Sequence, residues 1–179
     1  MRIAICDDDE RERNTVEEYV RAYQGIYPSI LFDISAYCSG EELLAAYQGG
    51  AKFDFLFLDI QMKDIDGIQT AQKIRKTNKH AIIFFITGFT QYISDAFTVN
   101  AFQFLLKPVK KDAFDREFQR ALDQYFIEHK TYMFEDKSRT IRMSSQSSLI
   151  LSMTTDFPQV EKIWKISLRI LLRGKEWSF

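Results

Sequence analysis

Residues able to do acid, hydroxyl and ammonium chemistry occur in this sequence where runs of apolar residues end. Asp7, Asp8 and Asp9 follow a short apolar run at the start of the chain, and Asp59, Thr87 and Lys107 each follow a later one. Singly, each has an ordinary explanation as a helix cap, a strand end or a solvated charge. If the runs are parallel strands of one sheet, however, their carboxyl ends meet at one edge and these side chains converge.

Such a convergence has chemical consequences. Two unit charges about 4 Å apart at an effective dielectric near 20 repel by roughly 4 kcal/mol, and one ammonium offsets only part of that. The carboxylates must therefore either take up protons or bind a divalent cation, and oxygen ligands favour Mg²⁺ with retained waters. A carboxylate nucleophile, a metal, a lysine and a hydroxyl are what a phosphoryl group in transfer requires. The predicted product is an acyl phosphate on one aspartate.

The elements that must position these side chains alternate between two hydrophobic periods. Short apolar runs predict buried strands, and apolar residues at helical spacing between them predict amphipathic helices. Asp9 with Glu12, and Ser39 with Glu42, are spaced as helix-start pairs. Five strand and helix units in succession imply an α/β fold, with an all-parallel sheet and helices on both sides. The predicted strands are Arg2–Cys6, Ile30–Ser35, Phe53–Leu58, Ala81–Ile86 and Ala101–Leu106, and the predicted helices begin near Asp9, Ser39, Gly67, Gln91 (to Val99) and Asp112.

Composition bounds the class of protein. With 179 residues, 46% of them hydrophobic, the chain can bury the core of one ordinary domain with a segment left over. The longest uninterrupted apolar run, Ala81–Ile86, is too short to cross a bilayer, and the N-terminus lacks a secretory signal, so we expect a cytoplasmic protein without membrane contact. Cys6 and Cys38 lack metal or redox spacing and are expected to be structural thiols.

Charge divides the chain unevenly. Residues 1–129 carry 15 Lys and Arg against 20 Asp and Glu, whereas residues 130–179 carry 9 against 5, which together make the totals of 24 and 25. We therefore predict an acidic domain over 1–129 and a separate basic tail over 130–179.

The strand-end residues, taken together, resemble the receiver domain of bacterial two-component response regulators, and two further segments resemble the LytTR branch of that family. The likeness covers residues 1 to about 125 and implies a flavodoxin-like (βα)5 sheet in the order 2-1-3-4-5. The receiver-like segments are Asp7-Asp8, Phe57–Met62, Asp66-Gly67, Thr87-Gly88 and Phe104–Pro108, and the LytTR-like segments are Tyr37–Leu44 and Asn100–Phe104.

The resemblance implies roles for the acidic residues. Asp59 would be the phospho-acceptor, attacking the phosphohistidine of a sensor histidine kinase. Asp8 would bind Mg²⁺ (or Mn²⁺) directly and Asp7 through water, with Asp59 and the backbone carbonyl of Gln61 completing the ligands. The protein would then be a signalling protein rather than an enzyme, with only self-catalysed phosphotransfer and dephosphorylation.

The same resemblance implies roles for the remaining site residues. Thr87 would turn towards the phosphoryl group, and Lys107 would pair with it beside a bond to Pro108 that is often cis in the family. Gly88 would keep that space open. Phe104 would be the aromatic switch, changing the partner preference of the face made by the fourth helix, fifth strand and fifth helix, a possible homodimer surface.

One departure from the family pattern lies in the loop after Asp59. Lys63 occupies the place where many relatives have proline after Met62. We expect this lysine to loosen the loop and to add positive charge near Asp59, without abolishing phosphorylation.

The tail resembles its family only at its start. Tyr132–Arg142 resembles the opening strand pair of a LytTR DNA-binding domain, but the likeness stops there and residues 130–179 are few for such a domain. We predict a linker and a truncated or divergent effector region. Three functions stay open: a regulator of transcription, with DNA as a possible ligand; a stand-alone receiver acting as phosphate sink or protein-binding switch; and an aspartyl phosphatase, which Gln61 argues against because that class needs an acid two residues after its nucleophile.

Overall fold

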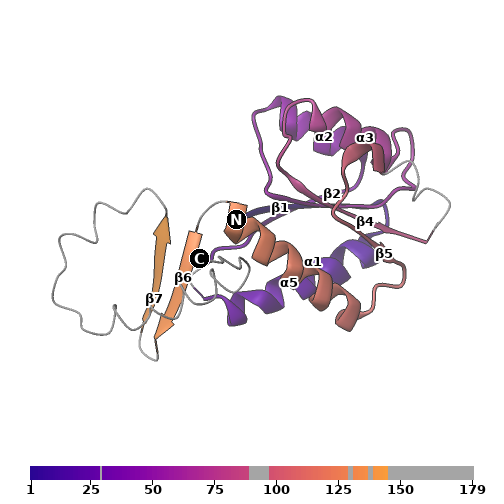
Figure 1. Ribbon diagram of the computed structural model, residues 1–179. Coiled ribbons are helices and arrows are strands. Elements are labelled where there is room, and N and C mark those ends of the chain that lie inside the picture. The colour runs from indigo at the N-terminus through magenta and orange to yellow at the C-terminus, as the bar shows by residue number, and fades with distance from the viewer. Residues whose placement is uncertain (29, 89–96, 129–130, 137–138, 145–179) are drawn as a thin grey trace, which may run out of the picture. The chain divides into compact units, whose positions relative to one another are not determined.

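The chain divides into two compact units, Met1–His129 and Lys130–Phe179. The computed structural model describes residues 1–28, 30–88, 97–128, 131–136 and 139–144 (Figure 1). None of the helices in these ranges is long and apolar enough to cross a membrane.

Strands and helices alternate along the first unit, as predicted. The strands are β1 (Arg2–Cys6), β2 (Asp33–Tyr37), β3 (Phe55–Leu58), β4 (Ile82–Thr87) and β5 (Gln103–Leu106); the helices are α1 (Glu10–Ile26), α2 (Gly40–Gln48), α3 (Gly67–Arg75), a 3-10 turn η2 (Phe97–Val99) and α5 (Lys111–Glu128). The strands pair in parallel in the order β2-β1-β3-β4-β5. Figure 1 shows α2 and α3 on one face of this sheet and α1 and α5 on the other. The predicted fold class and strand order are confirmed.

Alternation along β3 fills both layers of the core. Phe55 and Phe57 face α5, where their rings lie 5.6 and 5.8 Å from the ring of Phe118. Leu56 and Leu58 point to the opposite face and pack in the cluster below α2 and α3. Because all four residues are buried, β3 reads as the continuous apolar run expected of a central parallel strand. The partners from α2 and α3 are Leu43, Ile68, Ala71 and Ile74.

Local capping fixes where the helices begin. The Asp9 carboxylate accepts a hydrogen bond from the Arg11 amide and caps α1. The Ser39 hydroxyl accepts from the Glu42 amide at 3.2 Å, and the Glu42 carboxylate accepts from the amide of Cys38 at 2.8 Å. The predicted capping pair is therefore present, although the glutamate bonds to the residue before the cap.

The boundaries of several predicted elements need correction: β3 and β5 each begin two residues later than predicted, and the second strand and the helix over 91–99 differ more. The second strand begins at Asp33 rather than Ile30, because the Gln24 side chain binds the Ile30 carbonyl and the Phe32 amide and keeps them out of the ladder. Of the helix predicted over 91–99, only Phe97–Val99 lies within the described residues, where it forms a 3-10 turn.

The second unit contains a hairpin. Strands β6 (Thr131–Asp136) and β7 (Arg139–Ser144) pair antiparallel, which confirms the predicted strand pair over Tyr132–Arg142. Residues 145–179 lie outside the described residues, so the nature of the tail stays a prediction.

The start of α3 lies against the loop that follows Asp59. The Gly67 amide donates to the Ile60 carbonyl at 2.9 Å, and a Cβ atom at Gly67 would lie 2.0 Å from the carbonyl oxygen of Asp59. No side chain fits at this distance, so glycine is required there by the close approach of two backbones.

We expect Gly67→Ala to lower the free energy of unfolding by about 2–4 kcal/mol, because α3 or the loop after Asp59 must shift. Urea unfolding measures this. Gly25→Ala is the matched control: Gly25 lies within α1, where an added Cβ would meet no heavy atom of the described residues within 4 Å apart from its chain neighbours and the backbone of its own helix. This substitution should raise stability by about 0.5–1 kcal/mol. A Gly67→Ala protein as stable as wild type would contradict the close approach.

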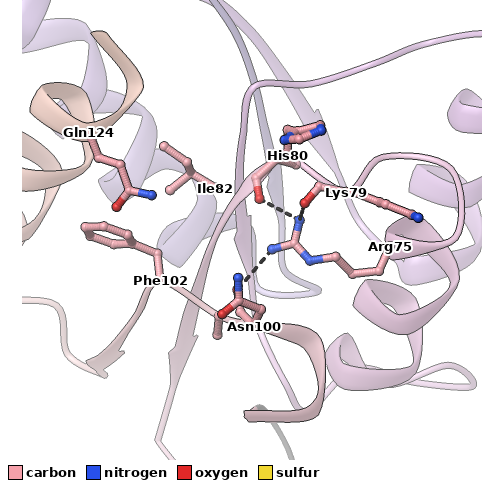
Figure 2. Close-up of a pocket in the computed structure, with 9 residues that line it drawn as sticks. Arg75, Lys79, His80, Ile82, Asn100, Phe102 and Gln124 are labelled. Carbon is pink, nitrogen blue, oxygen red and sulfur yellow. Dashed lines mark hydrogen bonds between the residues drawn. The ribbon is translucent and has the colours of Figure 1, made fainter. Parts of the chain in front are cut away.

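Arg75, the last residue of α3, ties the amino edge of the sheet together. Its guanidinium donates to the carbonyls of Val99 at 2.7 Å, Ala81 at 2.7 Å and Asn100 at 3.1 Å. It also reaches the carbonyls of Asn78 and Lys79 at 3.4 and 3.2 Å. This guanidinium also lines a hollow of about 410 Å³ between the α3 to β4 loop and Asn100. Figure 2 shows the side chains that surround it. No pattern in the sequence indicates this role of Arg75.

Arg75→Ala should lower the free energy of unfolding by about 2–4 kcal/mol, since it leaves several partly buried carbonyls without their charged donor. Arg75→Lys should recover only part of that loss, because an ammonium has three donors and lacks the fork geometry. Lys73→Ala, an exposed cation on the same helix, is the control and should change stability by less than about 0.5 kcal/mol. Equal effects at both positions in thermal and urea unfolding would disprove the anchoring role.

Candidate functional site

The two central strands deliver a pair of carboxylates to the carboxyl edge of the sheet. The parallel register pairs Cys6 of β1 with Leu58 of β3, and the Asp59 amide donates to the Cys6 carbonyl at 2.8 Å. The residues that follow, Asp7 and Asp59, therefore leave the sheet beside one another. Both are buried, with 4% and 5% of their surface exposed. Two buried carboxylates this close require a cation.

Lys107 supplies part of that positive charge. It directly follows β5, and its amide donates to the Thr87 carbonyl at 3.1 Å. Its ammonium lies 2.7 Å from Asp7 Oδ2 and 2.8 Å from Asp59 Oδ2, so it bridges the two carboxylates. The peptide bond from Lys107 to Pro108 is cis.

Thr87 completes this edge. It is the last residue of β4, pairs with Leu106 of β5 and is fully buried. The sheet thus brings residues from four strand ends to one edge, as the sequence predicted for Asp7, Asp59, Thr87 and Lys107.

Asp8 extends the cluster towards solvent. Carboxylate oxygens of Asp7, Asp8 and Asp59 all lie within 4.8 Å of one another, and Asp8 is exposed where the other two are buried. Three carboxylates against the single Lys107 ammonium leave net negative charge. An oxygen-only donor set with one open side fits Mg²⁺, which keeps part of its water shell. The backbone N–H of Gln61 donates a hydrogen bond to Asp59 Oδ1 at 3.3 Å. Metal binding by the backbone carbonyl of Gln61 stays a prediction.

Burial and charge shift the pKa values of this edge. Burial raises the pKa of the Asp7 carboxyl above its ordinary value, although the Lys107 ammonium and the Asp9 amide, which donates at 2.9 Å, act to lower it. Burial acts to lower the pKa of Lys107, but hydrogen bonds and negative charge from Asp59 and Asp7 outweigh it and raise that pKa. Lys107 therefore stays charged, whereas burial disfavours the charged form of the Asp7 carboxyl.

The remaining predicted residues flank this edge. Phe104 is partly exposed and stacks on Phe85 of β4, with ring centroids 5.4 Å apart. A Cβ atom at Gly88 would meet no heavy atom within 4 Å in the described ranges, so the expected crowding there concerns only an added phosphoryl group. The switch role of Phe104 and the supporting role of Gly88 stay predictions.

One contact at the site escaped sequence analysis. Arg13, in the first turns of α1, donates from Nη1 to the backbone carbonyl of Asp7 at 2.6 Å. This bond steadies the turn that carries both Asp7 and Asp8. An arginine six positions along the chain gives no periodic pattern by which it could have been found.

The family model of the response regulator receiver domain matches residues 3–119. The chain therefore belongs to the response regulator receiver family, and several of its relatives are proteins named LytR or LytT. The sensory transduction protein LytR of Staphylococcus epidermidis is 34% identical over 112 residues, which cover 63% of this chain and 42% of that protein. The transcriptional regulatory protein LytR of Staphylococcus aureus is 31% identical over 108 residues, or 60% and 42%. The matched region thus spans less than half the length of these relatives.

Solved structures share this fold. The response regulatory domain of mrkE from Klebsiella pneumoniae has a TM-score of 0.62 and 24% identity, covering 70% of this chain and 98% of that one. The response regulator TrrA of Thermotoga maritima, solved in complex with Mg²⁺ and BeF, has a TM-score of 0.57 and 27% identity, covering 67% and 97%. The predicted fold and family are confirmed by these comparisons.

We expect Asp7→Asn to raise the thermal midpoint by a few degrees at pH 7 without divalent metal. The folded-state pKa of Asp7 is raised, so its charge destabilises the folded protein above the unfolded pKa near 3.9, and that penalty fades as pH falls through the folded pKa. The gain should therefore shrink towards pH 4, while Lys107 keeps Asp59 as its partner.

Glu18→Gln removes one exposed charge from α1 and serves as the control, with little change at either pH. Thermal scans in chelator at both pH values make the comparison. An Asp7→Asn protein that melts at or below wild type at pH 7 would show that the Lys107 bridge outweighs burial.

Proposed function

We propose that this chain is the phospho-accepting part of a two-component regulator and that Asp59 receives the phosphoryl group from a sensor histidine kinase. The observation that carries the proposal is the Lys107 ammonium, held 2.8 Å from Asp59 Oδ2 at an edge that also holds Asp7, Asp8 and Thr87. An ammonium, a hydroxyl and an acidic cation site around one carboxylate are the parts that phosphoryl transfer needs. Structural ion pairs alone would not require the third acid, Asp8.

The transfer would proceed at Asp59 as follows. One carboxylate oxygen forms a bond to phosphorus, the bond between phosphorus and the kinase histidine nitrogen breaks, and its electron pair stays on the imidazole. The Lys107 ammonium, now paired with the Asp59 carboxylate, would pair with the negative phosphoryl oxygens after transfer, and the Thr87 hydroxyl would donate to one of them. The backbone N–H of Gln61 donates to Asp59 Oδ1 and so orients the nucleophile. A bound Mg²⁺ would neutralise phosphoryl oxygen charge, held by Asp8 and Asp59 directly and by Asp7 through water, with the Gln61 carbonyl.

A small acyl phosphate tests the acceptor without the kinase. With Mg²⁺, the wild-type protein should gain the mass of one phosphoryl group, and Asp59→Asn should gain less than about one hundredth as much at equal times, because an amide oxygen is a poor nucleophile. Intact mass spectrometry measures both.

Asp54→Asn provides a matched control, because Asp54 precedes the same strand and binds the Arg2 amide at the opposite edge. It should be phosphorylated like wild type, and chelation of divalent metal should stop the reaction in both. Equal labelling of Asp59→Asn and wild type would refute the assignment.

We further propose that phosphorylation alters the face that includes Phe104 and α5, and through it a homodimer or another output. Control of transcription by DNA binding is supported by the likeness to LytR and by the β6 to β7 hairpin, which agrees with the start of a LytTR domain. A specific shift of promoter DNA by the phosphorylated chain would support this output. Its absence would favour the stand-alone receiver, which acts as a phosphate sink or binds a protein.

A further inference from the structure

A second hollow lies beside the acidic cluster. It has a volume of about 370 Å³, within the range of small-ligand sites, and is lined by residues of the loop after β3 together with Asp8. Because Asp8 belongs both to this hollow and to the acidic cluster, the hollow borders the proposed acceptor site. The lining residues are Asp8, Ile60, Gln61, Met62, Lys63 and Asp66.

The lining of the hollow contains two acids and one cation. Its two acids are Asp8, which belongs to the acidic cluster, and Asp66, which caps α3 by accepting from the Gln69 amide at 2.7 Å. Lys63 is the single cation of the lining. Within the described part of the chain, Lys63 forms no hydrogen bond or ion pair, whereas Lys107 is bound to two carboxylates. Its charge is therefore available to something that enters the hollow.

The local backbone gives the lysine its place. Lys63 is exposed and is followed by Asp64, whose φ of +62° turns the chain sharply. Short polar residues such as aspartate tolerate this left-handed conformation, so the loop can bend after Lys63 and run back to the Asp66 cap. The lysine thus sits on a defined bend at the rim of the hollow.

The electrostatics decide what Lys63 can recognise. A donor that carries a doubly negative phosphoryl group and enters by this hollow meets Asp8 and Asp66, and both acids repel it. A cation at the rim offsets part of this repulsion before contact, and long-range attraction of this kind raises association rates at low salt. From the position of Lys63 in the lining of this hollow and from its charge, we propose that Lys63 is a specificity residue that selects small dianionic acyl phosphates as phosphoryl donors. This inference rests on the proposed function, since it names a substrate class for the same acceptor.

The test compares apparent second-order rate constants for phosphorylation of Asp59 at saturating Mg²⁺. Lys63→Gln should slow reaction with acetyl phosphate by about three- to tenfold at low salt, with a smaller effect on phosphoramidate, whose protonated nitrogen reduces its net charge. Lys63→Arg should restore the rate, and added salt should remove the difference. Lys52→Gln is the matched control, because it removes an exposed charge before the amino end of the same strand; it should leave both rates unchanged.

Several results would overturn the proposal. Equal rates for Lys63→Gln and Lys52→Gln with acetyl phosphate would mean that Lys63 recognises nothing. Equal slowing with both donors at every salt concentration would mean that the substitution distorts the loop. Slowing confined to transfer from a phosphohistidine kinase would mean that Lys63 contacts a protein. If wild type itself is not labelled on Asp59, the proposed function fails first, and that result is distinguishable from all three.

Discussion

The Lys107 ammonium is the contact on which the carboxyl edge of the sheet depends. It bridges Asp7 and Asp59, so three strand ends, those of β1, β3 and β5, are drawn to one point. Without it, two buried carboxylates would face each other in a medium where repulsion at about 4 Å amounts to several kcal/mol. With it, the edge is held together but still carries excess negative charge, because Asp8 has no share in the bridge. Because this excess negative charge is not neutralised by the protein, a hard cation can bind at the edge without first displacing a protein contact.

The amino edge of the same sheet solves the opposite problem. There Arg75 faces backbone carbonyls, and no carboxylate of the described residues pairs with it, so its bonds fix the α3 to β4 loop and the segment before β5. Burial lowers the pKa of this guanidinium but leaves it charged. The cations at the two edges thus differ in their partners. Arg75 binds neutral backbone carbonyls and stabilises the fold, whereas Lys107 binds two carboxylates at the proposed acceptor site. Helix α3 connects the two edges, because it begins at Gly67 and ends at Arg75. The missing side chain of Gly67 lets this helix start directly against Asp59, the residue after β3.

Much of this arrangement could be predicted from local patterns. The central strand was predictable because Phe55–Leu58 is apolar throughout, and the starts of α1 and α2 because Asp9 and Ser39 cap them through bonds to nearby residues. The start of β2 was not, since the Gln24 side chain decides which amides join the ladder. Contacts to backbone carbonyls were also out of reach, because carbonyls occur at every residue and mark no position in a sequence. Convergence at the carboxyl edge was predictable only because parallel topology follows from the alternation of elements.

The path from the acceptor to the output surface is short. Thr87 and Phe85 lie on β4, and Phe104 and Lys107 are on or directly after β5, so the proposed phosphoryl ligands and the proposed switch share one strand pair. In the structure the Phe104 ring stacks on Phe85 and is only partly buried. Such a ring pair contributes about 0.5–1.5 kcal/mol, whereas one new hydrogen bond to a charged group contributes about 1.5–3 kcal/mol. If Thr87, which already has an interaction partner, gains a bond to a charged phosphoryl oxygen as proposed, the net change is of the same order as the loss of the stack. Under that proposal, the two positions of the Phe104 ring are close enough in energy for phosphorylation of Asp59 to shift the balance between them.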